Sequence, residues 1–248
     1  MRSSSIHFVL LICFILISNV SSAIELPDNL TRNELDEVTE LLGFSTSSKL
    51  LSNPYALGGH SGFEIGYSTE FINTTDLSRL GSGAAKDSTY QFNRISFGKG
   101  VYNNVDIFFH FVPFSSSNEV SEYGGILKWG FYESDDLPLT LSLLAQTSTI
   151  NINDEFINEV LGADLLAGLN LTDFAIYIGG GSLRARSSFS RSILDSSVTL
   201  NSSGTLITRN SRAHTFAGIN INFKKIFIAA QIDRYDQPVY SAKIGLRF

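Results

Sequence analysis

The sequence predicts an all-β fold, namely a single antiparallel up-and-down transmembrane β-barrel of about ten strands, preceded by a short helix. Three observations predict it. Strand-length segments have an apolar residue at every second position, the connections between them alternate in length, and the chain begins with an export leader. A barrel meets lipid with only every second residue, so the ordinary hydrophobic content of 43% fits a membrane protein.

The first segment, residues 1–23, has the features of a secretory signal peptide. Arg2 stands near its start, an apolar run extends from Ile6 to Ile17, and small residues at 21–23 form a cleavage site, so we expect cleavage near Ala23. The only cysteine, Cys13, lies within this leader. The exported chain therefore has no disulfide, as expected of a barrel that closes in lipid.

Residues 24–60 form the next segment, ahead of a barrel expected over 61–248. Thr31 and Glu34 have the spacing of a capping box, and Leu30 and Leu35 have the spacing of a hydrophobic staple. An apolar stripe then runs to a stop at Gly43, which predicts a helix over 31–42 with an acidic outer face. We expect this helix at the mouth formed by the short turns, where it either plugs the barrel, binds a partner, or covers the rim.

The alternating pattern then predicts the strands of the barrel. They are expected near 63–71, 90–99, 105–111, 123–131, 137–143, 161–169, 174–178, 215–223, 226–232 and 240–248. The short turns, at 100–104, 135–136, 170–173 and 224–225, all fall at one end. Longer loops, such as 73–89, 115–118 and 182–212, fall at the other. A soluble β-sandwich has no reason to sort its connections in this way.

A glycine run interrupts one of these strands. Residues Gly179 to Gly181 look like a phosphate loop in isolation, but they open no helix, so we expect a bulge or a glycine kink. The sequence predicts no metal site and no cofactor. Its formal net charge of −6 argues against nucleic acid as a partner.

The last strand carries a more specific signal. Tyr240, Ala242, Ile244 and Leu246 alternate with polar residues, and the sequence stops on Phe248. This segment resembles the closing strand of bacterial outer-membrane β-barrels, in which a terminal aromatic is recognised by the barrel-insertion machinery. The resemblance implies a Gram-negative outer membrane. It also implies that the short turns and helix 31–42 face the periplasm, with a possible periplasmic partner for the helix.

Charged residues on the other face of the strands should point into the lumen, since a charge facing lipid costs about 2–4 kcal/mol at mid-bilayer. A barrel of this size has too little interior for a wide pore. We therefore expect a structural network of ion pairs inside it. Its members are Glu64, Arg94, Asp106, Lys128, Asp164, Lys243 and Arg247.

Four inward residues form a weak catalytic candidate near the outer mouth: Glu70, His110, His214 and Asp233. A histidine oriented by a carboxylate is the geometry of a general base, and the turn at 224–225 brings His214 opposite Asp233. The architecture is similar to that of the ten-stranded omptin proteases. No omptin motif is recognisable, so we carry over no catalytic role and expect no enzyme.

The loop expected over 182–212 is basic in an acidic chain. It contains Arg184, Arg186, Arg191, Arg209 and Arg212. Arginine binds phosphate with two parallel hydrogen bonds, so contact with lipopolysaccharide phosphates is one use of this loop. A solvated polar hairpin is the alternative.

These observations favour a small outer-membrane barrel with a structural or surface-interaction role, through lipopolysaccharide or an extracellular partner. The second possibility is a narrow channel for ions or small solutes. The third is an omptin-like or lipid-modifying enzyme.

Overall fold

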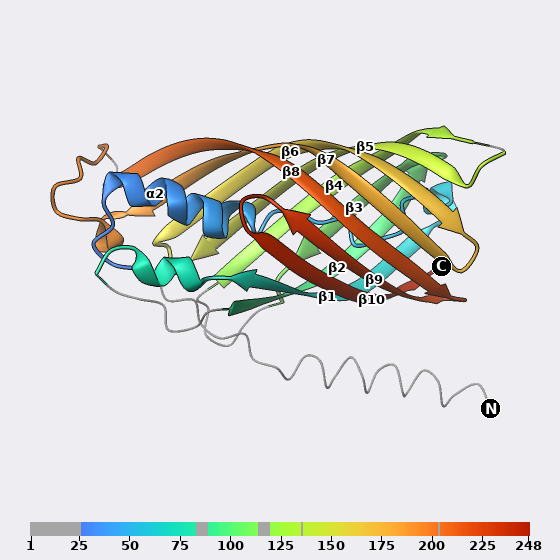
Figure 1. Cartoon of the computed structure of the whole chain (residues 1–248), viewed down its shortest axis with the longest axis horizontal. Coiled ribbons are helices and arrows are strands. Elements are labelled where there is room, and N and C mark those ends of the chain that lie inside the picture. Colours follow the sequence, from blue (N-terminus) through green and yellow to red (C-terminus); the bar gives the residue numbers. More distant parts are fainter. Residues whose placement is uncertain (1–25, 83–88, 114–119, 135, 203) are drawn as a thin grey trace, which may run out of the picture.

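The computed structural model describes residues 26–82, 89–113, 120–134, 136–202 and 204–248. In it ten antiparallel strands form a closed barrel in which β1 pairs with β10 (Figure 1). The strands are β1 (Phe63–Asn73), β2 (Thr89–Tyr102), β3 (Val105–Phe111), β4 (Val120–Glu133), β5 (Leu139–Ile152), β6 (Phe156–Leu171), β7 (Phe174–Ser190), β8 (Thr205–Phe223), β9 (Ile226–Arg234) and β10 (Pro238–Arg247). The predicted fold is confirmed. The expected leader 1–23, the loop residues 115–118 and Asp135 lie outside the described residues.

The outer surface carries an apolar belt, formed by large hydrophobic side chains that point outward and are exposed. Leu161 on β6 and Ile178 on β7 each expose 65% of their surface, and similar residues lie on the other strands. An exposed apolar area of this extent is the lipid-facing surface of a membrane barrel. The strands therefore span a membrane. None of the described helices is long and apolar enough to cross one.

The two ends of the barrel differ. Tight connections at 103–104, 172–173 and 224–225 lie at one end, here the short-turn end, together with the end of β4, the start of β5, the start of β1 and Phe248. The opposite, long-loop end carries the 3-10 helices η3 (Thr75–Arg79) and η4 (Arg191–Ile193). Two further connections at the long-loop end, 153–155 and 235–237, are also short. The predicted sorting of turns therefore holds at the short-turn end, and long and short connections mix at the other.

The predicted helix forms with the predicted cap. It consists of α2 (Arg32–Val38), continued by a π-helical turn, η1 (Thr39–Phe44). The Glu34 carboxylate accepts hydrogen bonds from the Thr31 backbone N–H at 2.7 Å and from its hydroxyl at 2.6 Å, which is one half of a capping box.

The expected position of this helix at the short-turn mouth is wrong, because α2 lies at the long-loop end (Figure 1). The Leu30 N–H donates to the Ile193 carbonyl, and Thr39 donates to Ser187 near the end of β7. The physical reason lies in the lumen. The larger cluster of buried apolar residues lies at the long-loop end, where Phe92, Phe156 and Phe189 receive the apolar stripe of the helix. Further down, charged side chains share the lumen with a second, smaller apolar cluster.

Residues 45–62, the lumen segment, run from η1 through the barrel to the start of β1 at the short-turn end (Figure 1). Every residue from 45 to 54 is buried. The segment contacts opposite walls of the barrel, with Ser48 donating to the Thr147 carbonyl on β5 and Ser52 to Glu64 on β1. The N-terminal segment is thus a plug. It enters the barrel at the long-loop end, whereas the short-turn end was expected.

Two further expectations are corrected in β7 and β8. Most of the expected loop 182–212 is strand, since β7 continues to Ser190 and β8 begins at Thr205. Most outward residues there are polar, with Ile207 on β8 as an exposed apolar exception. Leu183 and Ala185 point inward, where they pack with Phe44. Above the apolar belt, the apolar residues of these two strands lie mainly on the inner face and no longer on the outer one. A search for an apolar outer face therefore does not find these strand ends.

The glycine run produces no bulge. Gly179, Gly180 and Gly181 pair in continuous register with Phe216, Thr215 and His214 of β8. A Cβ on Gly181 would lie 1.9 Å from the Ala163 carbonyl oxygen, so the glycine allows a close approach of β6 and β7. Register shifts occur instead beside Gly100 and Gly130.

Candidate functional site

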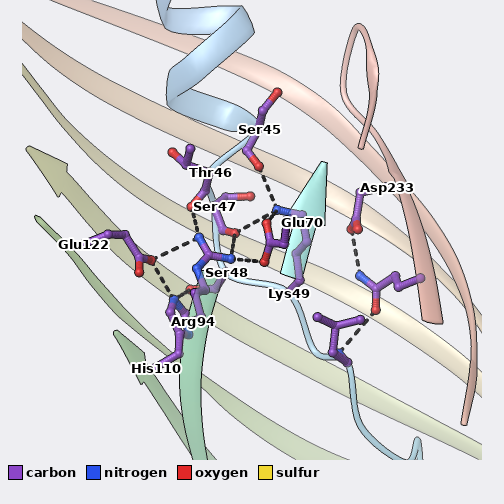
Figure 2. A network of polar contacts seen from close by, with 12 residues as sticks. Ser45, Thr46, Ser47, Ser48, Lys49, Glu70, Arg94, His110, Glu122 and Asp233 are labelled. Atoms are coloured by element: carbon purple, nitrogen blue, oxygen red, sulfur yellow. Dashed lines mark hydrogen bonds and ion pairs between the residues drawn. The ribbon is translucent and has the colours of Figure 1, made fainter. Parts of the chain in front are cut away.

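Among the residues that the structure describes, charged side chains form three groups in the lumen. The first, the upper cluster, consists of Lys49, Glu70, Arg94, His110 and Glu122 (Figure 2). Arg94 on β2 lies between Glu70 on β1 and Glu122 on β4, with a distance of 3.1 Å to Glu122. It also donates to the carbonyls of Thr46 and Ser47 in the lumen segment. The guanidinium therefore binds the plug to two strands.

Lys49 is the contribution of the plug itself to this cluster. Its Nζ lies 2.6 Å from a Glu70 oxygen and 2.7 Å from the Ser45 carbonyl. His110 completes the cluster, 2.9 Å from Glu122. All five side chains are buried, so each charge is compensated within the lumen, as buried charges require.

The second group lies near the short-turn end, at the seam between β1 and β10. Glu64 is paired in register with Arg247 and lies 2.7 Å from it, and a second cation, Lys243, lies 2.7 Å from its other oxygen. Ser52 of the lumen segment donates to the same carboxylate at 2.8 Å. Nearby, Lys128 on β4 pairs with Asp106 on β3 at 3.0 Å and donates to carbonyls of Asn53 and Tyr55.

The third group surrounds His214. Its Nδ1 lies 3.0 Å from Asp164 on β6 and its Nε2 lies 3.0 Å from Asp233 on β9. The ring stacks on Tyr235 with centroids 4.6 Å apart. An imidazole that donates from both nitrogens carries a positive charge. The two flanking carboxylates of this Asp–His–Asp arrangement are thus placed to accept from a protonated His214.

The structure brings together the expected pair His214 and Asp233, but it separates them from His110 and Glu70, which belong to the upper cluster. The surroundings also differ from the expected water-filled mouth. His214 is 2% exposed and is covered by the lumen segment. The adjoining cavity, lined by Ser48, Gln146 and Gln231 among others, has about 10 Å³.

A second cavity, beside Lys49, Glu70 and His110, has about 20 Å³. Each of these cavities has room for about one water molecule. Neither is large enough for a substrate. No group of three or more metal-ligating side chains suited to a metal ion occurs among the described residues.

Sequence reasoning missed three members of these clusters: Lys49, Glu122 and Tyr235. Glu122 could have been predicted from the sequence. It precedes Tyr123, which belongs to the outward face of its strand, so the alternation of side chains places Glu122 on the inward face. Lys49 is the single charge in a serine-rich stretch between helix and barrel. Only the position of that stretch inside the lumen gives the lysine its role.

The five arginines of the basic region divide into two groups. Arg184 and Arg186 on β7 and Arg209 on β8 point outward and are exposed. Arg212 points into the long-loop mouth and pairs with Glu40 of η1, and Arg191 in η4 donates to backbone carbonyls of its own loop.

The acidic face of the helix is used at the same mouth. Asp36 accepts a hydrogen bond from Asn210 at 3.1 Å, and Glu34 accepts one from the Gly81 N–H at 3.0 Å. The expected periplasmic partner for helix 31–42 therefore loses its basis, because these acids contact the barrel at the long-loop end.

No protein-family model matches the chain, and no curated protein sequence matches it. Among solved structures, the chain is similar to the N-terminal β-barrel domain of Pseudomonas aeruginosa OprF, with 12% identity over 77% of this chain and 99% of that one and a TM-score of 0.31. It is also similar to Ail of Yersinia pestis in complex with the heparin analogue sucrose octasulfate, with 14% identity over 75% and 97% and a TM-score of 0.32. A third is the outer membrane protease OmpT of Escherichia coli, with 8% identity over 75% and 95% and a TM-score of 0.35.

Proposed function

We propose that the chain is a non-conducting structural barrel of the bacterial outer membrane that contacts lipopolysaccharide through outward arginines. The observation that carries this proposal is the lumen, which the chain fills with its own residues 45–62. The cavities beside the plug, of about 20 and 10 Å³, are too small for a solute or a substrate. The surface is then the part of the molecule left to interact.

The outer-membrane location rests on the apolar belt, the export leader and the closing strand. In this proposal residues Tyr240 to Phe248 are recognised by the barrel-insertion machinery. Cell fractionation tests this step. The full chain should appear in the outer-membrane fraction, and removal of the Phe248 side chain by Phe248→Ala should reduce the folded, heat-modifiable form. Equal amounts of folded protein would remove the role of the terminal aromatic.

A planar-bilayer recording tests the filled lumen. The purified full chain should give no discrete conductance steps at any applied voltage. A narrow channel for ions or small solutes is the second candidate, supported by the charged lumen. Reproducible steps would favour the channel. They should then change in size with Lys49→Met, a variant of the plug, and remain unchanged with the exposed Arg79→Gln.

An omptin-like or lipid-modifying enzyme is the third candidate, and its support is the contact between His214 and Asp233. Burial of the ring under the plug argues against it. Hydrolysis of a fluorogenic peptide or of phospholipid would replace the structural proposal if it is lost in His214→Ala and retained in Arg79→Gln.

A further inference from the structure

Three arginines form a patch on the outer wall of the barrel, here the arginine patch: Arg184, Arg186 and Arg209. Arg186 on β7 and Arg209 on β8 are direct neighbours across the strand pair. Arg184 follows on the same face of β7, two residues away, opposite Ser211. Direct neighbours stand about 4.5–5.5 Å apart at Cβ, and all three arginines line the same groove, so their long side chains are able to contact one anion.

The charge of this patch is poorly compensated. Its acidic contact is Glu159 on β6, which lies 3.6 Å from Arg186, and both side chains are more than half exposed. Among the residues that the structure describes, Arg184 and Arg209 form no ion pair. Like charges directly across a strand pair are destabilising. An anion between the two strands would remove this repulsion.

The patch lies at the upper edge of the apolar belt. Arg184 pairs in register with Leu161, whose side chain belongs to the belt. A groove of about 680 Å³ extends over β5 to β8 at this level, and its lining includes Thr147, Leu161, Arg184, Arg209 and Ser211. This volume is in the range of small-molecule sites.

Directly below the groove, toward the short-turn end, the outer wall carries small side chains. One row across the four strands consists of Ala145, Ala163, Ser182 and Ala213, which are successive register partners. Gly180 and Thr215 continue it downward on β7 and β8. The small side chains therefore leave a shallow depression in the outer surface between the larger Leu161 and Ile178. An extended hydrocarbon chain fits into this depression.

We propose that this surface binds one phosphorylated lipid of the outer leaflet, with a phosphate between Arg184, Arg186 and Arg209 and an acyl chain along the row of small residues. Arginine favours phosphate because its planar guanidinium forms two parallel hydrogen bonds. A lipid fits better than a free anion because the cationic and the apolar parts of the surface are contiguous. The inference rests on the proposed contact with lipopolysaccharide and assigns it to one site.

The test uses the full chain in nanodiscs of zwitterionic lipid that contain a small share of bisphosphorylated lipid A. Native mass spectrometry counts the lipid A retained by the barrel. The wild type should retain it in preference to the bulk lipid and to dephosphorylated lipid A. The triple variant R184Q/R186Q/R209Q should bind it about tenfold or more weakly, since it loses several charge-assisted hydrogen bonds. Arg79→Gln, at the same end and paired with Asp76, should bind as the wild type does.

A second pair of measurements separates lipid from free phosphate. Ala213→Trp fills the shallow depression and should weaken retention of lipid A, and inorganic phosphate at millimolar concentration should not displace the lipid. Displacement by phosphate with no effect of Ala213→Trp would mean a simple anion site and would overturn the lipid assignment. The tryptophan faces outward among lipid-facing residues, so the barrel should still fold, which its heat-modifiable mobility checks.

The remaining outcomes separate this site from the proposed function. If the wild type prefers lipid A and the triple variant binds it equally well, the contact with lipopolysaccharide stands and this site is wrong. If the wild type shows no preference for lipid A, both are wrong.

Discussion

Lys49 of the lumen segment and Glu70 on β1 form an ion pair of 2.6 Å, and neither side chain is exposed. Arg94 contacts the other oxygen of the same carboxylate. Glu70 therefore compensates two cations, one from the plug and one from the wall, whereas Lys49 compensates only one acid.

Removal of the carboxylate should cost more than removal of the lysine. Glu70→Gln leaves Lys49 without its acidic partner, and an unpaired buried charge costs roughly 3–5 kcal/mol. Lys49→Met leaves Glu70 paired with Arg94, so it should cost clearly less. Denaturant unfolding in detergent, with both single variants and the double, measures this order. A free energy of unfolding lowered more by Lys49→Met than by Glu70→Gln would contradict the shared role of Glu70.

The seam between β1 and β10 should be linkable from the outer face. Thr69 and Ala242 are register partners. The pair Thr69→Cys and Ala242→Cys should therefore form a disulfide in folded protein, since paired Cβ atoms come close to the distance a disulfide needs. Non-reducing electrophoresis of the heat-denatured sample detects the link. Thr69→Cys with Ile228→Cys, two strands away from β1, is the control. A link in the control and none in the seam pair would place β10 elsewhere.

Because the plug enters the barrel at the long-loop end, residues before α2 should be accessible from that side of the membrane. Asp28 and Ser202 are exposed there, and Lys225 lies at the opposite end. In intact cells a membrane-impermeant maleimide should label Asp28→Cys and Ser202→Cys, and it should label Lys225→Cys only after the outer membrane is opened. Labelling of Lys225→Cys in intact cells would invert the orientation of the barrel. Labelling of Ser202→Cys but not Asp28→Cys would instead contradict the position of the plug.

The cap of α2 should loosen in acid. The pKa of Glu34 is lowered from its ordinary value, first by the Thr31 hydroxyl that donates to it and then by the Gly81 and Thr31 backbone N–H groups. A carboxyl with a lowered folded pKa stabilises fully above its unfolded value, and this contribution is lost as the pH falls through the folded value. Protection of the Thr31 and Gly81 amides from hydrogen exchange, relative to the intrinsic rate at each pH, should therefore fall below about pH 4.

Glu34→Gln supplies the control for this pH dependence. Its neutral amide retains the shape of the side chain and does not titrate. Protection of the Thr31 and Gly81 amides, relative to the intrinsic exchange rate at each pH, should therefore be lower at neutral pH and should no longer change in the acid range. The same acid response in Glu34→Gln would assign the change to another group.

Much of the barrel could be predicted from the sequence because lipid imposes a period of two on the outer face. The contact between Glu64 and Arg247 could also be predicted, since an open edge is not tolerated in lipid and parity places both side chains inside. The ends of β7 and β8 could not, because their outward residues, among them Arg184 and Arg209, stand above the lipid belt and need not be apolar.

The position of the plug was beyond sequence reasoning. The capping residues Thr31 and Glu34 specify where α2 begins, but not which mouth receives its apolar stripe. That choice depends on Phe92, Phe156 and Phe189, whose shared location in the lumen follows only from the register of three different strands. Lys49 could be assigned to Glu70 only once that choice was known.

The route of residues 45–62 also constrains the order of assembly. The segment precedes β1 in the chain, and the pairing of β1 with β10 is the contact that closes the wall around it. A peptide with buried polar contacts to β1, β2, β4 and β5 does not thread easily into a finished cylinder, because each of those contacts would have to form in a confined space. We therefore expect residues 45–62 to be in place before β10 pairs with β1, so that the interior of the protein forms before its outer wall is complete.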